Sequence, residues 1–337
     1  MPGFGCEHAE NGNHAPAARL LSGVSATQRH SGSVTRHRTV QLVGLSVAAG
    51  AVAVAVALSG VAPGTSWFEG ARSSPAAGDA PPSITDEPLA RIAAVGDTGT
   101  GDLAERATAQ RMSVESQQIP YDALVLLGDM IYEDGDAALV DERVTDPFAA
   151  LVDDGAALIP VLGNHDYDSG EQQQILAALG RGRSWYTQRI GPVRVVVLDS
   201  NLIDNPEQTR WLQLTLARPQ PSSTWTVVVM HHPAYSAGYH GSTASVQQAW
   251  APLFAEYDVP LVLAGHDHDY QRSVLIDGVT YVVSGAGAKV RPTGQDDFTA
   301  VSASSLHFLD LLFYRDRIVG RAIDQSGQLV DIFTISR

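Results

Sequence analysis

The sequence contains a single cysteine, Cys6, and a single lysine, Lys289, among its 337 residues. One cysteine excludes a disulfide bond within this sequence and a metal site built on several thiolates. Any metal site must therefore use oxygen and nitrogen ligands. Charged residues are also scarce, at 18%, whereas hydrophobic residues reach 44%. This balance is typical of a soluble globular core and argues against a largely disordered or a multispanning chain.

Positive charge is in short supply, and it is unevenly distributed. The formal net charge is −15, from 22 basic and 37 acidic side chains. Residues 1–84 hold five basic and four acidic ones, which leaves 17 basic and 33 acidic side chains in the remainder. Because an acidic domain repels nucleic acid at long range, we expect no DNA or RNA partner.

The first 85 residues differ in composition from the rest and predict three segments. Residues 1–39 are polar and aperiodic, which predicts a disordered cytoplasmic tail. Residues 42–61 hold no charged side chain, and a helix of this length spans roughly 30 Å, enough to cross a bilayer core. We therefore interpret residues 40–62 as a transmembrane anchor or signal segment. Residues 63–85 are rich in Pro, Gly and Ser and predict a flexible linker.

Three arginines before the apolar segment predict its orientation. Arg29, Arg36 and Arg38 precede it, so the positive-inside rule places the N-terminus in the cytoplasm and the rest outside. We expect a single N-terminal helix in the cell membrane and an extracytoplasmic domain over residues 86–337. The alternative is secretion after cleavage of a signal peptide, whose apolar region is usually shorter.

Residues 86–337 alternate between short β-branched runs and helix-like stretches. The stretches predict helices over residues 102–118, 172–179, 206–217 and 246–257. This alternation predicts an α/β layered domain.

Five of the apolar runs end in polar clusters. These clusters are Gly-Asp at 96–97, Gly-Asp at 128–129, Gly-Asn-His-Asp at 163–166, His-His-Pro at 231–233 and Gly-His-Asp-His at 265–268. Ligands of open α/β sheets bind beyond the carboxyl ends of the strands, so these residues are expected to share one pocket. The candidate metal ligands are Asp97, Asp129, Tyr132, Asn164, His231, His266 and His268.

The candidate ligands combine oxygen and imidazole donors, which suit hard or borderline ions such as Fe, Mn or Zn. Seven ligands suit two ions with one bridging carboxylate. Each motif alone has an ordinary alternative, since Gly-Asp is a common turn pair and a buried histidine or tyrosine is usually a core residue. A sixth run ends at Asp199, which we interpret as a structural turn residue.

The order GD, GD, GNHD, HHP, GHDH resembles the calcineurin-like metallophosphoesterases. Most of that superfamily has a histidine ligand two residues after the first aspartate, where this chain has Gly99. The purple acid phosphatases, including the tartrate-resistant type, lack that histidine and use a tyrosine three residues after the second aspartate, which here is Tyr132. The resemblance covers residues 88–337 and is greatest to this group. It implies an α/β, four-layer fold, in which a β-sandwich of two mixed sheets is flanked by helices.

The resemblance also implies a division of the ligands and an activity. Asp97, Asp129, Tyr132 and His268 would hold a ferric ion, and Asp129 would bridge to a divalent ion (Fe, Zn or Mn) held by Asn164, His231 and His266. The implied reaction is hydrolysis of a small phosphate monoester by a metal-bound hydroxide, at a two-metal centre that lowers the pKa of bound water.

Two further histidines are candidates for contacting the phosphate and donating a proton. His165 follows Asn164 directly, and we expect Asp166 to orient it. His240 occupies the place of a family histidine outside the ligand set, although a surface-loop role is the alternative. We interpret His232 as structural. Lys289 and Arg291 are weaker candidates for reaching the substrate.

Two rival functions fit parts of the pattern. A phosphodiesterase with a dinuclear Mn or Fe site shares the fold, but Gly99 together with Tyr132 argues against it. A membrane-anchored domain that binds metal or phosphate without turnover is the second rival, and the complete ligand set argues against that one.

Overall fold

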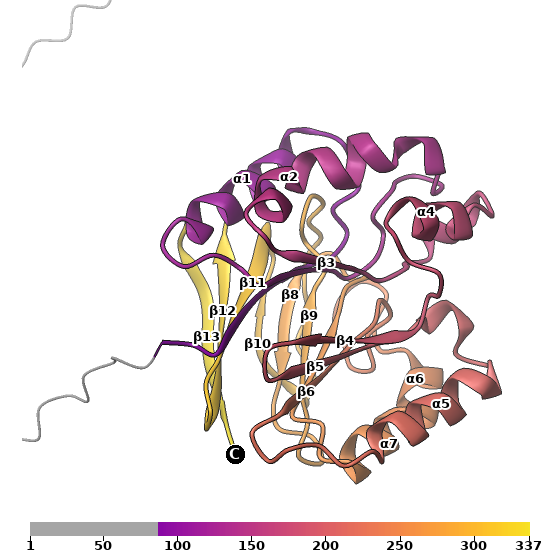
Figure 1. Ribbon diagram of the computed structural model, residues 1–337, viewed down its shortest axis with the longest axis vertical. Helices are drawn as coiled ribbons and strands as arrows, with labels where there is room; N and C mark the ends of the chain where they lie inside the picture. The colour runs from indigo at the N-terminus through magenta and orange to yellow at the C-terminus, as the bar shows by residue number, and fades with distance from the viewer. Residues whose placement is uncertain (1–86) are drawn as a thin grey trace, which may run out of the picture. The chain divides into compact units, whose positions relative to one another are not determined.

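The computed structural model describes residues 87–337, and the expectations for residues 1–39, 40–62 and 63–85 lie outside this range. No helix within residues 87–337 has both the length and the apolar character needed to cross a membrane. The described chain forms two mixed β-sheets that pack face to face, with helices on both outer faces (Figure 1).

The first sheet has six strands in the order β13-β12-β11-β1-β2-β3. The neighbours β1, β2 and β3 are parallel, and β11 pairs antiparallel with β1. The strands are β1 (Ala90–Val95), β2 (Ala123–Leu126), β3 (Ala157–Pro160), β11 (His307–Phe313), β12 (Arg317–Asp324) and β13 (Leu329–Ser336).

The second sheet has seven strands in the order β10-β8-β9-β7-β6-β5-β4. Its middle strands β5, β6, β7 and β9 are parallel. The strands are β4 (Tyr186–Ile190), β5 (Val193–Val197), β6 (Trp225–Val229), β7 (Leu261–Ala264), β8 (Tyr270–Ser273), β9 (Thr280–Ser284) and β10 (Thr299–Ala303).

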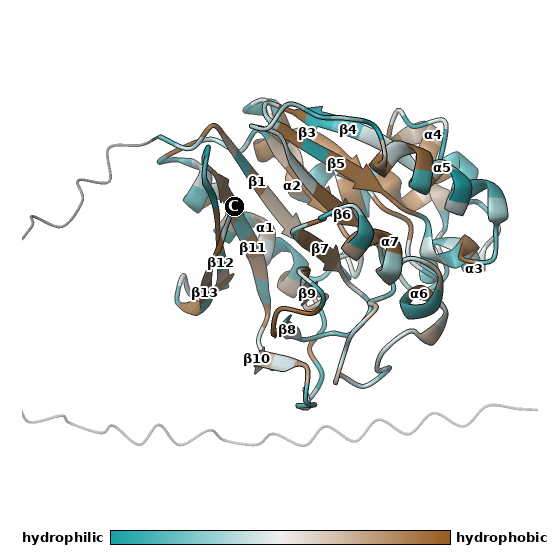
Figure 2. Ribbon diagram, turned by 90° about the horizontal axis from the view of Figure 1, so that it is seen from below, coloured by the Kyte–Doolittle hydropathy of each residue, from teal (hydrophilic) through white to brown (hydrophobic). Residues whose placement is uncertain are grey.

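The central strands are apolar on both faces because each sheet is covered on both sides. Ile92 of β1 and Val195 of β5 point into the core between the sheets. Their neighbours Ala93 and Val196 point outward, under the helices. In the sequence these strands appear as continuous apolar runs, which is typical of parallel strands that are buried on both faces. Figure 2 shows this as hydrophobic strands inside more polar helices. The implied four-layer sandwich is confirmed.

Helices cover the two outer faces. Over the first sheet lie α1 (Leu103–Ser116), α2 (Asp146–Asp153) and α4 (Gln172–Ala178), and over the second lie α5 (Pro206–Leu216), α6 (Ala244–Ala249) and α7 (Ala251–Glu256). Short helical turns are η1 (Ala137–Leu139), η2 (Asp141–Thr145), α3 (His165–Asp168) and η3 (Ser200–Leu202).

Local signals explain where the helices begin and break. Asp102 caps α1 by accepting hydrogen bonds from the backbone N–H groups of Ala104 and Glu105. The single helix predicted over 246–257 is wrong, since the structure has α6 and α7 there, divided at Trp250. Pro252 lacks the backbone N–H that would continue α6, and this divides the helix. Helix α2 has no counterpart among the predicted helices.

Candidate metal centre

Five loops converge at the carboxyl ends of parallel strands. Three follow β1, β2 and β3 of the first sheet, and two follow β6 and β7 of the second. The structure brings all seven candidate ligands together at this point. Their donor atoms divide into two clusters.

The first donor cluster is centred on the phenol oxygen of Tyr132. This oxygen lies 3.1 Å from Asp97 Oδ1, 3.1 Å from Asp129 Oδ2 and 3.1 Å from His268 Nε2. His268 Nε2 is also 3.3 Å from Asp97 Oδ1. All four side chains are buried.

The second donor cluster is centred on Asn164. Its Oδ1 lies 3.1 Å from His231 Nε2 and 3.1 Å from His266 Nδ1, and the two ring nitrogens are 3.3 Å apart. The other carboxylate oxygen of Asp129, Oδ1, is 3.4 Å from His231 Nε2. Asp129 therefore belongs to both clusters, one oxygen in each. Donor atoms roughly 3.0–3.4 Å apart match the edges of a coordination shell with bonds of about 2.1 Å.

The backbone at this centre is held in an unusual conformation. Asp97, Asp129 and His266 have φ angles of 58°, 52° and 73°. Residues other than glycine rarely adopt this left-handed region, and such strain collects at functional sites. Each of these residues is the first polar residue after its glycine, so the strain lies where the chain turns out of the strand.

Gly99 stands where most relatives in the superfamily would have a histidine ligand. A Cβ atom here would overlap the backbone carbonyl group of Met130. The close approach is fixed by two hydrogen bonds, from Gly99 N–H to the carbonyl of Asp129 (3.2 Å) and from Tyr132 N–H to the carbonyl of Gly99 (2.8 Å). No side chain fits at Gly99, and the same contact delivers Tyr132 to the first donor cluster.

Burial and mutual repulsion shift the pKa values of the clustered acids. Burial raises the pKa of Asp97. Burial also raises the pKa of the Tyr132 phenol, and the carboxylates of Asp97 and Asp129 raise it further. Burial raises the pKa of Asp129 as well, but the charges and hydrogen bonds of His231 and His165 together outweigh burial and lower the pKa. A bound cation would favour the ionised form of every one of these oxygens.

His231 is oriented toward the second donor cluster by its own backbone contact. Its Nδ1–H donates to the carbonyl of Leu127 (2.8 Å), which leaves Nε2 facing Asn164. This second contact is the one that typically fixes the tautomer of a metal-binding histidine. Burial lowers the pKa of His231, but Asp129, Asp97 and the hydrogen bond to Leu127 together outweigh burial and raise the pKa to about 10. A cation would compete with that proton for Nε2.

The expectation that Asp166 orients His165 is wrong. The buried carboxylate of Asp166 accepts hydrogen bonds from the backbone N–H groups of Met130 (3.0 Å), Ile131 (3.0 Å) and Gly163 (2.8 Å). No hydrogen bond joins it to the His165 imidazole within residues 87–337. Successive residues of a helical turn point in different directions, so Asp166 ties the loops after β2 and β3 together instead. Burial raises the pKa of Asp166 to about 8, and Asp129 adds to the rise.

His165 and His240 flank the centre on different sides. The His165 ring lies 4.7 Å from the Tyr132 ring, and its Nδ1 is 3.5 Å from Asp168. The His240 ring lies 4.3 Å from the His266 ring. One histidine therefore adjoins each donor cluster, and neither is a member of one.

Two cationic side chains stand beside these groups. The Nζ atom of Lys289 lies 3.5 Å above the Tyr132 ring and 3.1 Å from Glu133. The guanidinium of Arg291 donates to Nε2 of His240 (2.8 Å). Both come from the loop after β9, so the structure brings them to the rim of the centre.

Other residues near the centre are structural. Nδ1 of His232 is 2.8 Å from the hydroxyl of Ser200, whose Oγ also accepts from the His232 N–H. Asp199 accepts from the Asn201 N–H (3.2 Å) at the start of η3, in agreement with a turn role, and also from the Tyr167 hydroxyl (2.6 Å). Tyr235 packs against Tyr281, with ring centroids 4.7 Å apart.

The role of Asp267 in holding the His240 loop was not predicted from the sequence. Asp267 is fully buried and accepts from the backbone N–H groups of His240 (2.7 Å) and Gly241 (3.2 Å) and from the hydroxyl of Ser236. It therefore holds the loop that presents His240. The available signal was its place between two candidate ligands, His266 and His268.

Comparison with known proteins shows similarity to phosphoesterases. The family model described as calcineurin-like phosphoesterase matches residues 90–270, more than half of the chain. Purple acid phosphatase 3 of Arabidopsis thaliana is 25% identical over 249 residues, covering 64% of this chain and 68% of that protein. Human tartrate-resistant acid phosphatase type 5 is 29% identical over 255 residues, covering 63% and 78%.

Solved structures show the same fold. The purple acid phosphatase PPD1 from yellow lupin (Lupinus luteus) seeds has a TM-score of 0.61 at 20% identity, covering 74% of this chain and 54% of that one. GAP50 of Plasmodium has a TM-score of 0.64 at 15% identity, covering 73% and 88%.

Proposed function

Because the chain belongs to the calcineurin-like phosphoesterase family, we propose that it is a phosphatase that hydrolyses phosphate monoesters at a centre of one ferric and one divalent ion. The observation that carries the proposal is the pair of adjacent donor clusters, each of which contains one carboxylate oxygen of Asp129. Two ions bound there would activate water and neutralise the charge on the phosphoryl oxygens.

The two clusters fit different ions by their chemistry. The first has the oxygens of Tyr132, Asp97 and Asp129 and one imidazole, from His268. Three hard anionic donors favour a ferric ion. The second has the amide of Asn164, two imidazoles and one oxygen of Asp129, which suits divalent Fe, Zn or Mn.

His165 and His240 would contact the phosphate and supply a proton to the leaving oxygen. Each lies beside one cluster, so a phosphate between the clusters is within reach of both. Asp267 positions His240 through its backbone N–H, and Arg291 fixes its ring. A leaving alkoxide needs such a proton donor near the working pH.

The test combines metal analysis, the visible spectrum and hydrolysis of p-nitrophenyl phosphate between pH 4 and 9. We expect iron, a broad tyrosinate-to-iron band and activity. Tyr132→Phe should abolish the band, and Tyr314→Phe, which alters a ring stacked under Arg317 away from the centre, should keep it. A colourless, active manganese protein would overturn the metal assignment. Preference for bis-p-nitrophenyl phosphate would favour the phosphodiesterase, and no hydrolysis with both metals loaded would favour a binding domain.

We also propose that residues 40–62 anchor the protein, with residues 86–337 outside the cytoplasm. The support is the uncharged run with arginines before it. A C-terminal epitope on the full chain should remain in carbonate-washed membranes and be accessible to external protease. Shortened protein in the medium would favour signal cleavage, and soluble cytosolic protein would overturn both alternatives.

A further inference from the structure

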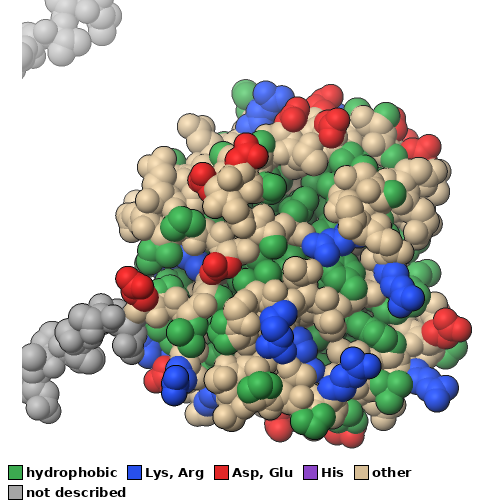
Figure 3. Space-filling view, in the orientation of Figure 1, with side chains coloured by type: hydrophobic (Ala, Val, Ile, Leu, Met, Phe, Trp, Pro, Cys, Tyr) green, Lys and Arg blue, Asp and Glu red, His purple; other side chains and the backbone are tan. Residues whose placement is uncertain are grey.

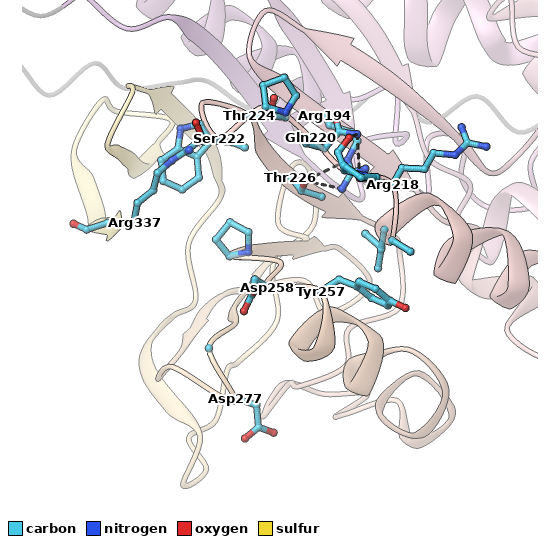
Figure 4. Close-up of a pocket in the computed structure, with 18 residues that line it drawn as sticks. Arg194, Arg218, Gln220, Ser222, Thr224, Thr226, Tyr257, Asp258, Asp277 and Arg337 are labelled. Carbon is cyan, nitrogen blue, oxygen red and sulfur yellow. Dashed lines mark hydrogen bonds between the residues drawn. The ribbon is translucent and has the colours of Figure 1, made fainter.

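A hollow of about 730 Å³ lies at the amino ends of the strands of the second sheet (Figure 4). Its walls include Arg194 of β5, Trp225 and Thr226 of β6, Pro260 before β7, and the loop of residues 218–224 after α5. The metal centre uses loops at the opposite, carboxyl ends. Strands of five residues place roughly 17 Å between the two ends, so the hollow is a separate site.

Arg194 has only neutral partners in this hollow. Its side chain is 8% exposed and donates to the hydroxyl of Thr226 (3.0 Å) and to the carbonyl of Thr215 (2.8 Å). Within residues 87–337, no carboxylate forms a salt bridge with Arg194 or Arg218. A buried charge without a counter-charge is costly, so an anion from outside would be favoured here.

Further positive charge surrounds Arg194. Arg189 lies opposite it across the β4–β5 pair, and Arg218 follows α5. Burial lowers the pKa of Arg194, and the charges of Arg189 and Arg218 lower it further. Arg337 lies over the Trp225 ring at 4.1 Å. The protein as a whole is acidic, so this concentration of arginines stands out.

The face around the hollow is polarised. Figure 3 shows Lys and Arg side chains gathered over the β4–β6 side of this view, with acidic ones mostly toward the edges. Two exposed acids, Asp258 and Asp277, also line the hollow. Figure 4 shows Asp277 away from the group formed by Arg194, Gln220 and Thr226. An anion would therefore bind at the arginine end.

We propose that this hollow is a second ligand site, which binds a phosphate-bearing anion through Arg194 and Arg218. A guanidinium pairs well with phosphate oxygens, and Arg194 has N–H groups beyond those used by Thr226 and Thr215. The volume suits a small molecule. A free phosphoanion and an anionic lipid headgroup present the same group, and the experiment separates them. The proposal is independent of the reaction at the metal centre.

The first arm titrates inorganic phosphate calorimetrically into the full chain, before and after metal removal with a neutral chelator. We expect one binding event to survive chelation. Arg194→Met should weaken that event about tenfold, as loss of a charge-assisted hydrogen bond predicts. Arg194→Lys should restore part of the affinity, and Arg218→Gln should weaken binding without disturbing the buried wall. Arg210→Gln, an exposed arginine on α5 outside the hollow, is the matched control.

The second arm measures flotation with phosphatidylcholine vesicles that contain or lack phosphatidic acid. A preference for phosphatidic acid that disappears in Arg218→Gln, without phosphate binding in the first arm, would assign a lipid headgroup. Phosphate binding without that preference would assign a soluble anion. The proposal is overturned if neither arm shows binding that depends on Arg194 or Arg218, or if Arg210→Gln has the same effect.

Discussion

The two ends of the parallel strands carry buried charges of opposite sign. At the carboxyl ends, Asp97 and Asp129 are buried and have histidines but no Lys or Arg within salt-bridge distance in the described chain. At the amino ends of the second sheet, Arg194 is buried beside neutral groups. Arg91 differs from both, since it forms a buried pair with Asp310 (2.9 Å). A buried charge that is paired within the protein, as in Arg91–Asp310, contributes to the stability of the fold. A buried charge without such a partner instead favours the binding of an external ion of opposite charge.

The largest effect is expected at the residue shared by the two donor clusters. Asp129→Asn replaces one carboxylate oxygen by an amide NH2 and removes the negative charge shared by the two clusters, so both ions should bind weakly. We expect the rate of p-nitrophenyl phosphate hydrolysis to fall on the order of 10³-fold, because several kcal/mol of charge stabilisation is lost. Metal analysis should show less than the wild-type content. Asp153→Asn, at an exposed carboxylate at the end of α2, is the control, and equal activity of the Asp129 and Asp153 variants would contradict the assignment of Asp129.

The balanced pair should give the largest effect on stability. Arg91→Met leaves Asp310 buried with only the partly exposed Arg321 as a partner. We expect a loss of about 3–5 kcal/mol of unfolding free energy, as for other broken buried pairs. Urea denaturation measures this directly. A loss of unfolding free energy below about 1 kcal/mol would show that the Arg91–Asp310 pair does not stabilise the fold more than an exposed pair does.

Glu105 allows a test of pH dependence at the carboxyl ends. It is buried in the first turn of α1, with one oxygen accepting from Gly101 N–H and the other unpaired in the described chain. Burial raises its pKa from 4.5 to about 8, so the folded state retains a proton that the unfolded state loses. Stability from this group is therefore full below about pH 4.5 and is lost as pH rises toward 8.

Glu105→Gln should remove that loss. Between pH 5 and 8, the wild type should lose up to about 1.4 kcal/mol per pH unit relative to the variant. Urea midpoints measured across this range provide the test, with Glu115→Gln at the end of α1 as a control. Parallel curves for wild type and Glu105→Gln would contradict it.

The smallest effect is expected for the unbalanced arginine. Arg194→Met keeps the bulk of the side chain and removes a charge that has no carboxylate partner. The carbonyl of Thr215 keeps the N–H of Arg218 (3.4 Å) as a donor. We expect stability within about 1 kcal/mol of wild type. A loss of unfolding free energy as large as that of Arg91→Met would show that Arg194 stabilises the fold. It would contradict the distinction between the paired Arg91 and the unpaired Arg194.

The convergence of the candidate ligands could be predicted from the sequence because each of them lies in the loop that follows an apolar strand. The strands meet at one edge, so position along the chain translates into position in space. Asp166 was misassigned because adjacency in sequence does not give the direction of a side chain. The arginines that line the hollow come from β5, the end of α5 and the end of β13, and no local pattern connects them.

Lys289, above the Tyr132 ring, has a chemical consequence. It is the only lysine in the sequence, so an amine-reactive dye has one ε-amino target besides the α-amino group. The α-amino group has a lower pKa, about 7.7–8.0, and can be capped first. A dye placed on Lys289 would then report from beside the first donor cluster, and its fluorescence quenching would follow the loading of a paramagnetic metal in real time without an engineered label.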